Sequence, residues 1–185
     1  MSDARAQHGV VALSPTPVLT TGRLTLRAPT AADWPAWRLF AMSDRAQYIG
    51  GPFSEASAWR AFGNAVGMWV LRGYGSFVFT ERGSDLALGM AGPWHQIESP
   101  EREIGWSLWS LAAEGKGFAF EAASRARAYA FDVLGWDTAV SYIDYANTRS
   151  VALAHRLGAV EDRQAAMPGD TPCHVFRHPR HEVRA

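Results

Sequence analysis

Two hydrophobic periods run along the chain, and they separate the expected strands from the expected helices. In residues 23–27 apolar and polar positions alternate, which predicts a half-buried strand with Leu24 and Leu26 inward. After Gly117, apolar residues recur three and four positions apart, which predicts a long helix with one apolar face. Similar patterns predict strands at about residues 23–27, 76–80, 86–94, 103–109, 138–143, 159–164 and 174–177.

The order of these elements predicts an α/β (α+β) fold in a single domain. The strands on either side of the long helix should pair in parallel through a right-handed crossover, and the three strands before it should form an antiparallel meander. We therefore expect a mixed, mostly antiparallel central sheet of about seven strands, with helices on both faces, over residues 19–177. Residues 1–18 and 178–185 are expected to be a flexible N-terminal tail and a C-terminal tail.

Composition restricts the binding partners and the cellular location that we expect for the protein. Lys and Arg total 18, as do Asp and Glu, so the formal net charge is zero and no nucleic-acid partner is expected. The apolar runs are too short to span a membrane, and residues 1–19 lack the pattern of a signal peptide, so no membrane partner is expected. The single cysteine, Cys173, favours a reducing, cytoplasmic location. The sequence leaves open whether the chain forms a homodimer.

Cys173 and His174 are neighbours, but they do not predict a covalent catalyst. Adjacent residues of a strand point to opposite faces, so the histidine should not share a proton with the thiol. We interpret Cys173 as a small buried or edge residue.

A glycine-rich junction lies between the fourth expected strand and the long helix, in the segment Glu114-Gly115-Lys116-Gly117-Phe118-Ala119. Glycines let backbone amides approach a ligand closely, and a helix start offers unpaired N–H groups and the positive end of the helix dipole. The junction therefore suits a phosphate group. A glycine-rich turn before a core helix explains the same residues.

This arrangement resembles the GNAT superfamily of acetyl-CoA-dependent N-acetyltransferases. The family signature, Gln/Arg-x-x-Gly-x-Gly/Ala, matches at residues 114–119. Residues 19–27, 115–122, 147–150 and 156–159 are similar to the RimJ/RimL-like branch, which contains the ribosomal-protein N-terminal acetyltransferases. The resemblance implies a GNAT-like fold with acetyl-CoA as co-substrate and no metal.

The resemblance also implies where acetyl-CoA binds. Backbone amides of the glycine junction would hold the pyrophosphate, and they belong to Gly115, Lys116, Gly117, Phe118 and Ala119. The pantetheine arm would add to the splayed end of the fourth strand, near Trp109 and Leu111. Asn147 could bond an amide of that arm, or it could cap the helix that follows it.

The implied reaction is direct attack of a neutral amine on the thioester, which requires a group that removes the proton of the ammonium form. Glu103 is the candidate base, through a water molecule, because it lies on the fourth strand and burial there would raise its pKa. Its alternative role is an ion pair with Arg102 or another cation. Glu101 and His95 are weaker candidates.

Two residues depart from the family pattern. Many relatives carry a tyrosine acid four residues after the serine equivalent to Ser150, and this chain has Ala154 there. Ser150 could donate to the sulfur instead, or it could simply sit in the first turn of a helix. Glu114 replaces Gln/Arg, and a carboxylate beside a pyrophosphate should weaken binding unless it turns away or Lys116 offsets its charge.

The sequence therefore predicts an N-acetyltransferase that moves acetyl from acetyl-CoA to a primary amine, either a protein N-terminus or a small-molecule amine. The alternative is a catalytically weak CoA-binding sensor or interaction module. A nucleotide-binding enzyme of another α/β class is disfavoured by the mixed strand order. The first two helices should border the acceptor, and their many aromatic residues favour an apolar or aromatic amine.

Overall fold

The structure is a computed structural model that describes residues 13–169 and 172–180. Most of the expected N-terminal tail, residues 1–12, lies outside the described residues, as do residues 181–185 of the expected C-terminal tail. Within the described part, no helix combines the length and the apolar character that a membrane crossing requires.

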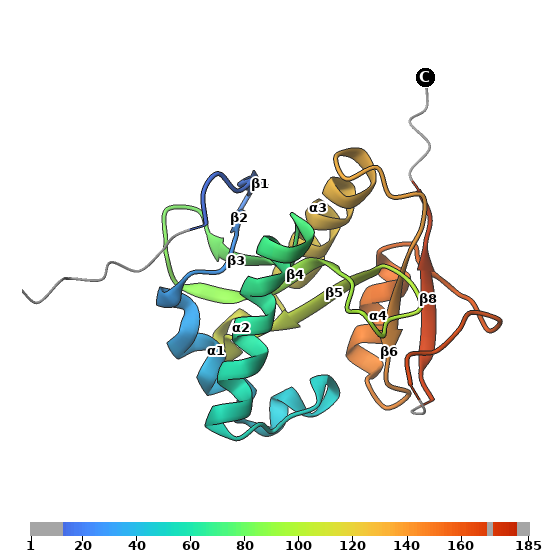
Figure 1. Cartoon of the computed structure of the whole chain (residues 1–185), viewed down its shortest axis with the longest axis horizontal. Coiled ribbons are helices and arrows are strands. Elements are labelled where there is room, and N and C mark those ends of the chain that lie inside the picture. The colour runs from blue at the N-terminus through green and yellow to red at the C-terminus, as the bar shows by residue number, and fades with distance from the viewer. Residues whose placement is uncertain (1–12, 170–171, 181–185) are drawn as a thin grey trace, which may run out of the picture.

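Eight strands of the described residues form one sheet in the order β1-β2-β3-β4-β5-β6-β8-β7 (Figure 1). The pairing is antiparallel throughout except between β5 and β6, which are parallel. The prediction of a mixed, mostly antiparallel sheet is confirmed. An eighth strand arises because Leu19 and Thr20 pair separately with β2. The strands are β1 Leu19–Thr20, β2 Leu24–Arg27, β3 Phe77–Glu81, β4 Ala87–Trp94, β5 Glu103–Leu108, β6 Ala139–Ile143, β7 Val160–Glu161 and β8 His174–His178.

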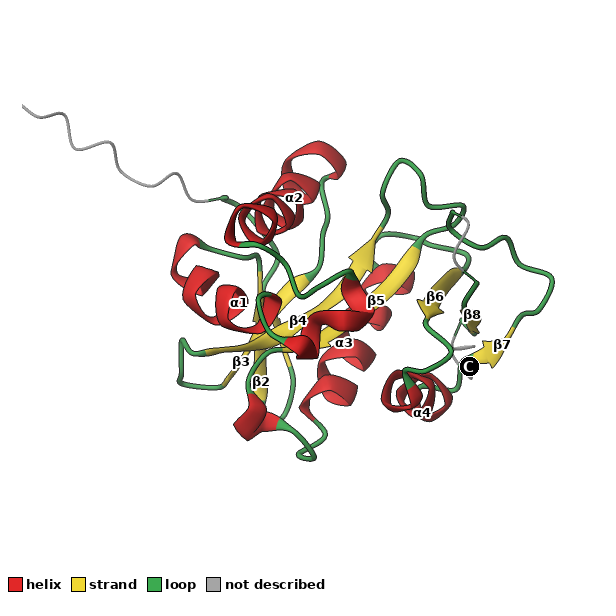
Figure 2. Ribbon diagram, turned by 90° about the horizontal axis from the view of Figure 1, so that it is seen from below, coloured by secondary structure: helices red, strands yellow, loops and turns green. Residues whose placement is uncertain are grey.

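Helices cover both faces of the sheet, as expected, with α1 and α2 on one face and α3 and α4 on the other (Figure 2). Three short 3₁₀ segments, η1, η2 and η3, lie between these elements. The helical elements are η1 Ala31–Asp33, α1 Trp34–Ala41, η2 Asp44–Ile49, α2 Glu55–Arg72, η3 Leu111–Ala113, α3 Phe118–Asp132 and α4 Thr148–Arg156.

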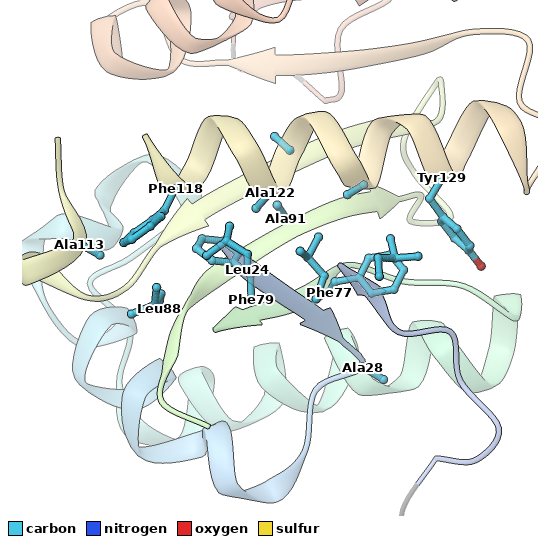
Figure 3. Close-up of a cluster of buried hydrophobic side chains, with 14 of the residues drawn as sticks. Leu24, Ala28, Phe77, Phe79, Leu88, Ala91, Ala113, Phe118, Ala122 and Tyr129 are labelled. Atoms are coloured by element: carbon cyan, nitrogen blue, oxygen red, sulfur yellow. The ribbon is translucent and has the colours of Figure 1, made fainter. Parts of the chain in front are cut away.

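Helix α3 packs closely against the sheet because its inward positions are small. Ala122, Ala123 and Ala126 are fully buried there, beside the larger Phe77 and Phe79 of β3 (Figure 3). Their small side chains let the helix axis approach the strands while the phenylalanines fill the remaining volume. The glycine junction immediately precedes α3 and follows η3, beyond the end of β5.

Strands β5 and β6 begin side by side and then separate. They share one register pair, Glu103 with Val140, and the Val140 N–H donates to the Arg102 carbonyl at 2.9 Å. The next carbonyl, Ile104, accepts from the hydroxyl of Ser141 at 2.5 Å instead of from a backbone amide. A side chain therefore takes over from the backbone ladder at the point where the strands diverge.

His178 fixes the Ser141 hydroxyl in this position. Its Nε2 lies 2.8 Å from Ser141 Oγ, and burial lowers the pKa of the imidazole to about 3, so the ring is neutral. We expected His178 to begin the C-terminal tail, but it is the last residue of β8 and is only 2% exposed. The expected boundary was one residue too early, because the polarity of histidine suggested exposure while its partner Ser141 lies 37 positions away.

We predict that Ser141→Ala lowers the free energy of unfolding by about 1–3 kcal/mol, because the Ile104 carbonyl and the His178 ring would each lose a buried partner. Chemical denaturation measures this change. Ser124→Ala on α3 is the matched control and should stay within about 0.5 kcal/mol of the wild type. Equal effects of the two substitutions would contradict the role assigned to Ser141.

Candidate active site

A cavity of about 370 Å³ passes through the sheet where β5 and β6 diverge. Trp37 and Phe62 line it from the side of α1 and α2, and Asn147 and Ser150 line it from the side of α4. Glu103 lies between the two sides, at the start of β5. Because the opening connects both faces of the sheet, two different molecules can meet in it from opposite sides.

Glu103 is the expected base, and the structure places it in this cavity. Its Oε1 accepts from the Ser99 hydroxyl at 2.9 Å, so its hydrogen-bond partner is neutral rather than the cation of the alternative interpretation. Burial raises the pKa of Glu103 to about 7, although the Ser99 hydrogen bond opposes the shift. Near neutral pH this carboxylate can therefore accept and return a proton.

The two weaker candidates for the base occupy other environments. Glu101 receives two hydrogen bonds from Arg177, at 2.7 and 2.9 Å, and these lower the pKa of its carboxyl group. Burial, together with the charges of Arg72 and Arg102, lowers the pKa of His95. Neither residue lines the cavity, so of the three candidates Glu103 alone has both the location and the raised pKa.

The glycine junction forms a tight loop before α3. Gly115 and Gly117 have φ angles of 73° and 78°, in the left-handed region that favours glycine. Gly117 is the N-cap of α3 without a side-chain cap, and the Glu121 N–H makes the first bond back to the Gly117 carbonyl. The N–H groups of Phe118 and Ala119 precede that bond and have no acceptor within the helix. The loop can therefore receive an anion.

Arg23, the residue before strand β2, braces this loop. Its guanidinium donates to the Lys116 carbonyl at 2.9 Å and forms an ion pair with Glu121 at 2.6 Å. These contacts join the loop to the first turn of α3. The loop is consequently held in shape before any ligand binds.

Glu114, the departure from the signature, points toward arginines. Its two carboxylate oxygens accept from Arg45 at 2.8 Å and from Arg149 at 3.1 Å. We expected Lys116 to offset this charge, but the two arginines are the partners that the structure shows. Sequence reasoning missed Arg45, because it lies on η2 and 69 positions from Glu114.

Trp109 and Leu111 were expected beside the pantetheine arm, and the structure places neither on the cavity. Trp109 follows the end of β5, and its ring packs against Trp37 at 5.4 Å between centroids. Leu111 lies on η3 and is 68% exposed. Instead, Trp106 lines the cavity. The backbone carbonyls of Arg102 and Ile104 point toward β6. Because alternate residues of a strand direct their backbone groups to the same neighbour, the backbone groups of Trp106 face the gap between β5 and β6.

Asn147 and Ser150 both line the cavity at the start of α4. Asn147 caps the helix, because its Oδ1 accepts from the Ser150 N–H at 3.2 Å. Its side-chain amide group still carries donors for a ligand. The Ser150 hydroxyl oxygen accepts from the Trp106 indole at 3.1 Å, which leaves the hydroxyl proton to donate. Ala154 is fully buried.

Cys173 and His174 are not among the residues that line this cavity. His174 pairs with Glu161 at 2.7 Å rather than with Cys173. Among the described residues, no three of His, Cys, Asp or Glu come together as a site for a metal ion. Tyr142 does line the cavity, and sequence reasoning missed it because its strand was interpreted only as buried. Tyr142 lies two residues after Val140, the register partner of Glu103, so the strand register is needed to recognise it.

Comparisons with known proteins show which family has this fold. A crystal structure of an acetyltransferase from Agrobacterium tumefaciens str. C58 shares 36% identity, with 92% of this chain and 98% of that chain covered and a TM-score of 0.85. A putative GNAT-family acetyltransferase from Bordetella pertussis shares 26% identity over 89% of this chain and all of its own length, with a TM-score of 0.73. A search of curated proteins found no match.

The fold extends to more distant proteins. RimL, a ribosomal L7/L12 alpha-N-protein acetyltransferase solved in complex with coenzyme A, shares 17% identity. The comparison covers 87% of this chain and 96% of RimL, with a TM-score of 0.66, and at that identity it shows the fold alone. The sequence model of the acetyltransferase (GNAT) domain matches residues 23–160. With three quarters of its length matched in this way, the chain belongs to the GNAT acetyltransferase family.

Proposed function

We propose that the chain transfers an acetyl group from acetyl-CoA to a primary amine by direct attack in a ternary complex. The observation that carries this proposal is the cavity through the sheet, with Glu103 at the start of β5 and Ser150 across the gap. It lets the donor approach from the side of α3 and α4 and the amine from the side of α1 and α2. The alternative, a sensor that binds CoA without turnover, does not require a buried base.

The donor side fits acetyl-CoA. The pyrophosphate would meet the backbone amides from Gly115 to Ala119, where two glycines and a helix start leave N–H groups open. The side-chain amide of Asn147 and the backbone of Trp106 would face the pantetheine arm. Bound in this way, acetyl-CoA supplies an activated thioester, and these residues orient it toward the cavity.

On the acceptor side, Glu103 would move the proton. A primary amine has a pKa of about 10, so at neutral pH it arrives as ammonium and must lose a proton before it can attack. Glu103, with a pKa of about 7, can take that proton directly or through water. A thiol has a pKa of about 8.5, so the leaving thiolate needs little assistance, and the Ser150 hydroxyl can donate to it.

The acceptor class remains part of the proposal, with a protein N-terminus and a small-molecule amine as the two alternatives. A cytoplasmic location belongs to the same proposal, because acetyl-CoA chemistry and a single cysteine both suit a reducing compartment.

We predict that Gly117→Val weakens CoA binding about 100-fold, which corresponds to about 2.7 kcal/mol. A β-branched residue is strained at a φ of 78°, so the loop would have to change its backbone conformation and with it the direction of its N–H groups. Calorimetric titration with CoA and with acetyl-CoA measures the change. Gly135→Val is the matched control, since Gly135 has a φ of 67° and no atom near an added Cβ, and lies after α3. Undiminished affinity in Gly117→Val would disprove the phosphate-binding role.

We also predict that Glu103→Gln lowers kcat/KM about 100-fold at pH 7 and less at alkaline pH. The carboxylate must be ionised to act as a base, so the wild-type rate should rise with pH through about 7, whereas the rate of the variant should rise only at higher pH, as the amine itself loses its proton. At higher pH more of the amine is already neutral, so the base matters less. Glu98→Gln, at an exposed residue of the preceding loop, is the control. An equal loss at every pH would show that Glu103 is not the base.

A further inference from the structure

The half of the cavity toward α1 and α2 is walled by aromatic side chains. Trp37 and Phe62 stack at 6.5 Å between ring centroids, and Phe53, Met90 and Trp94 extend the wall. Rings of this kind bury large apolar area and favour an apolar or aromatic body in a ligand. This half would receive the acceptor under the proposed function, on which the present inference rests.

The charges along the cavity match a single positive charge on the acceptor. Among the described residues that line it, none is Lys, Arg or His. The carboxylates are Glu103 and Asp144, and Asp144 is exposed, with its Oδ1 bonded to the Ala146 N–H at 2.7 Å. A carboxylate on the substrate would have no cation to pair with among these lining residues. A second ammonium group on the substrate would have no second buried carboxylate to pair with. An amino acid or a diamine therefore fits poorly.

The polar groups of this half are too few for a peptide. The Ser76 hydroxyl donates to the Pro93 carbonyl at 3.2 Å, and the Ser107 oxygen accepts from the Trp109 indole at 2.9 Å. The amides of Asn64 and Gln96 are exposed at the rim. Peptide groups that entered between the rings would lose water without gaining partners. The geometry favours a small amine over a protein N-terminus.

Tyr142 brings a buried hydroxyl group to the cavity. Tyr142 lies two residues beyond Val140, the register partner of Glu103, so its side chain shares the face on which Glu103 lies. The Tyr142 hydroxyl is buried and makes no hydrogen bond of ordinary geometry among the described residues, and the backbone N–H of Glu101 is the polar group near its oxygen. Burial raises the pKa of Tyr142 to about 12, and the nearby Glu103 carboxylate adds to the rise, so the phenol stays neutral.

We propose that the acceptor is a small primary amine with one positive charge on an apolar, aromatic-sized body, and that Tyr142 and Glu103 together hold its nitrogen. An ammonium group has three N–H donors that need acceptors. Ser99 occupies Oε1 of Glu103, which leaves Oε2 and the phenol oxygen of Tyr142 as acceptors on the same face. Tyr142 thus acts as a positioning residue that aligns the amine with the base.

The first test compares acceptors with the wild-type protein at saturating acetyl-CoA, with release of free CoA as the readout. The panel contains phenethylamine, 1,4-diaminobutane, phenylalanine and a short peptide with a free N-terminus. We expect kcat/KM for phenethylamine to exceed each of the others by at least about 10-fold. Preference for the diamine, the amino acid or the peptide would overturn this inference and leave acetyl transfer intact. If acetyl-CoA binds but no amine is acetylated, the proposed function fails as well.

The second test separates Tyr142 from a merely structural role. Tyr142→Phe should raise the KM for phenethylamine about 10-fold and leave the KM for acetyl-CoA and the thermal unfolding midpoint nearly unchanged. Tyr145→Phe is the matched control, because Tyr145 is 54% exposed and its ring packs on His174, 4.5 Å away between centroids. An unchanged KM for the amine, or an equal rise in both KM values, would refute the positioning role.

Discussion

The separation of β5 from β6 is the constraint on which the rest of the site depends. A parallel pair normally continues its ladder of backbone hydrogen bonds, but here the pairing stops after Glu103 and Val140. The Ser141 hydroxyl satisfies the next carbonyl, and the neutral ring of His178 holds that hydroxyl in place. Backbone groups buried at the mouth of the gap therefore keep partners while the strands diverge. Without the hydrogen bond from the Ser141 hydroxyl, the gap would either close or leave the Ile104 carbonyl unpaired.

The gap places groups with different chemistry on its two sides. On one side, the start of α4 and the glycine loop before α3 present amides and hydroxyls that suit a phosphate-bearing donor. On the other, aromatic side chains line the cavity around the Glu103 carboxylate, and burial raises its pKa to about 7. Under the proposed function, the same burial that raises the pKa of Glu103 also disfavours charged groups other than the ammonium group that Glu103 would deprotonate. In this proposal, the selectivity of the site and the basicity of Glu103 have one physical cause, burial.

Electrostatic compensation explains how the chain tolerates Glu114 in its signature. A carboxylate next to a phosphate site is unfavourable by itself, but Arg45 and Arg149 both bind this one. Arg45 also donates to the Leu108 and Trp109 carbonyls at the end of β5. One arginine therefore joins η2 both to the end of β5 and to Glu114, at the start of the loop before α3. Two positive groups around one negative group leave the surroundings of the loop favourable to an anion.

Local patterns in the sequence predicted much of this protein. The alternation in residues 23–27, the helical period after Gly117 and the glycine pair at a strand-to-helix junction each depend on neighbours within a few positions. The element order then implied the mixed sheet, and the position of Glu103 on its strand marked the candidate base. The structure confirms the elements and their order, because periodicity and capping are properties of short segments, while the role of Glu103 stays a prediction.

Tertiary structure alone decided the contacts between distant segments. The pairing of Arg45 with Glu114, the burial of His178 against Ser141 and the place of Tyr142 beside Glu103 all follow from strand register and from the point at which β5 and β6 part. The packing of the Trp109 side chain in the core, away from the gap, likewise depends on tertiary structure. Such contacts join residues tens of positions apart, and no repeating pattern in a single sequence encodes which of them meet.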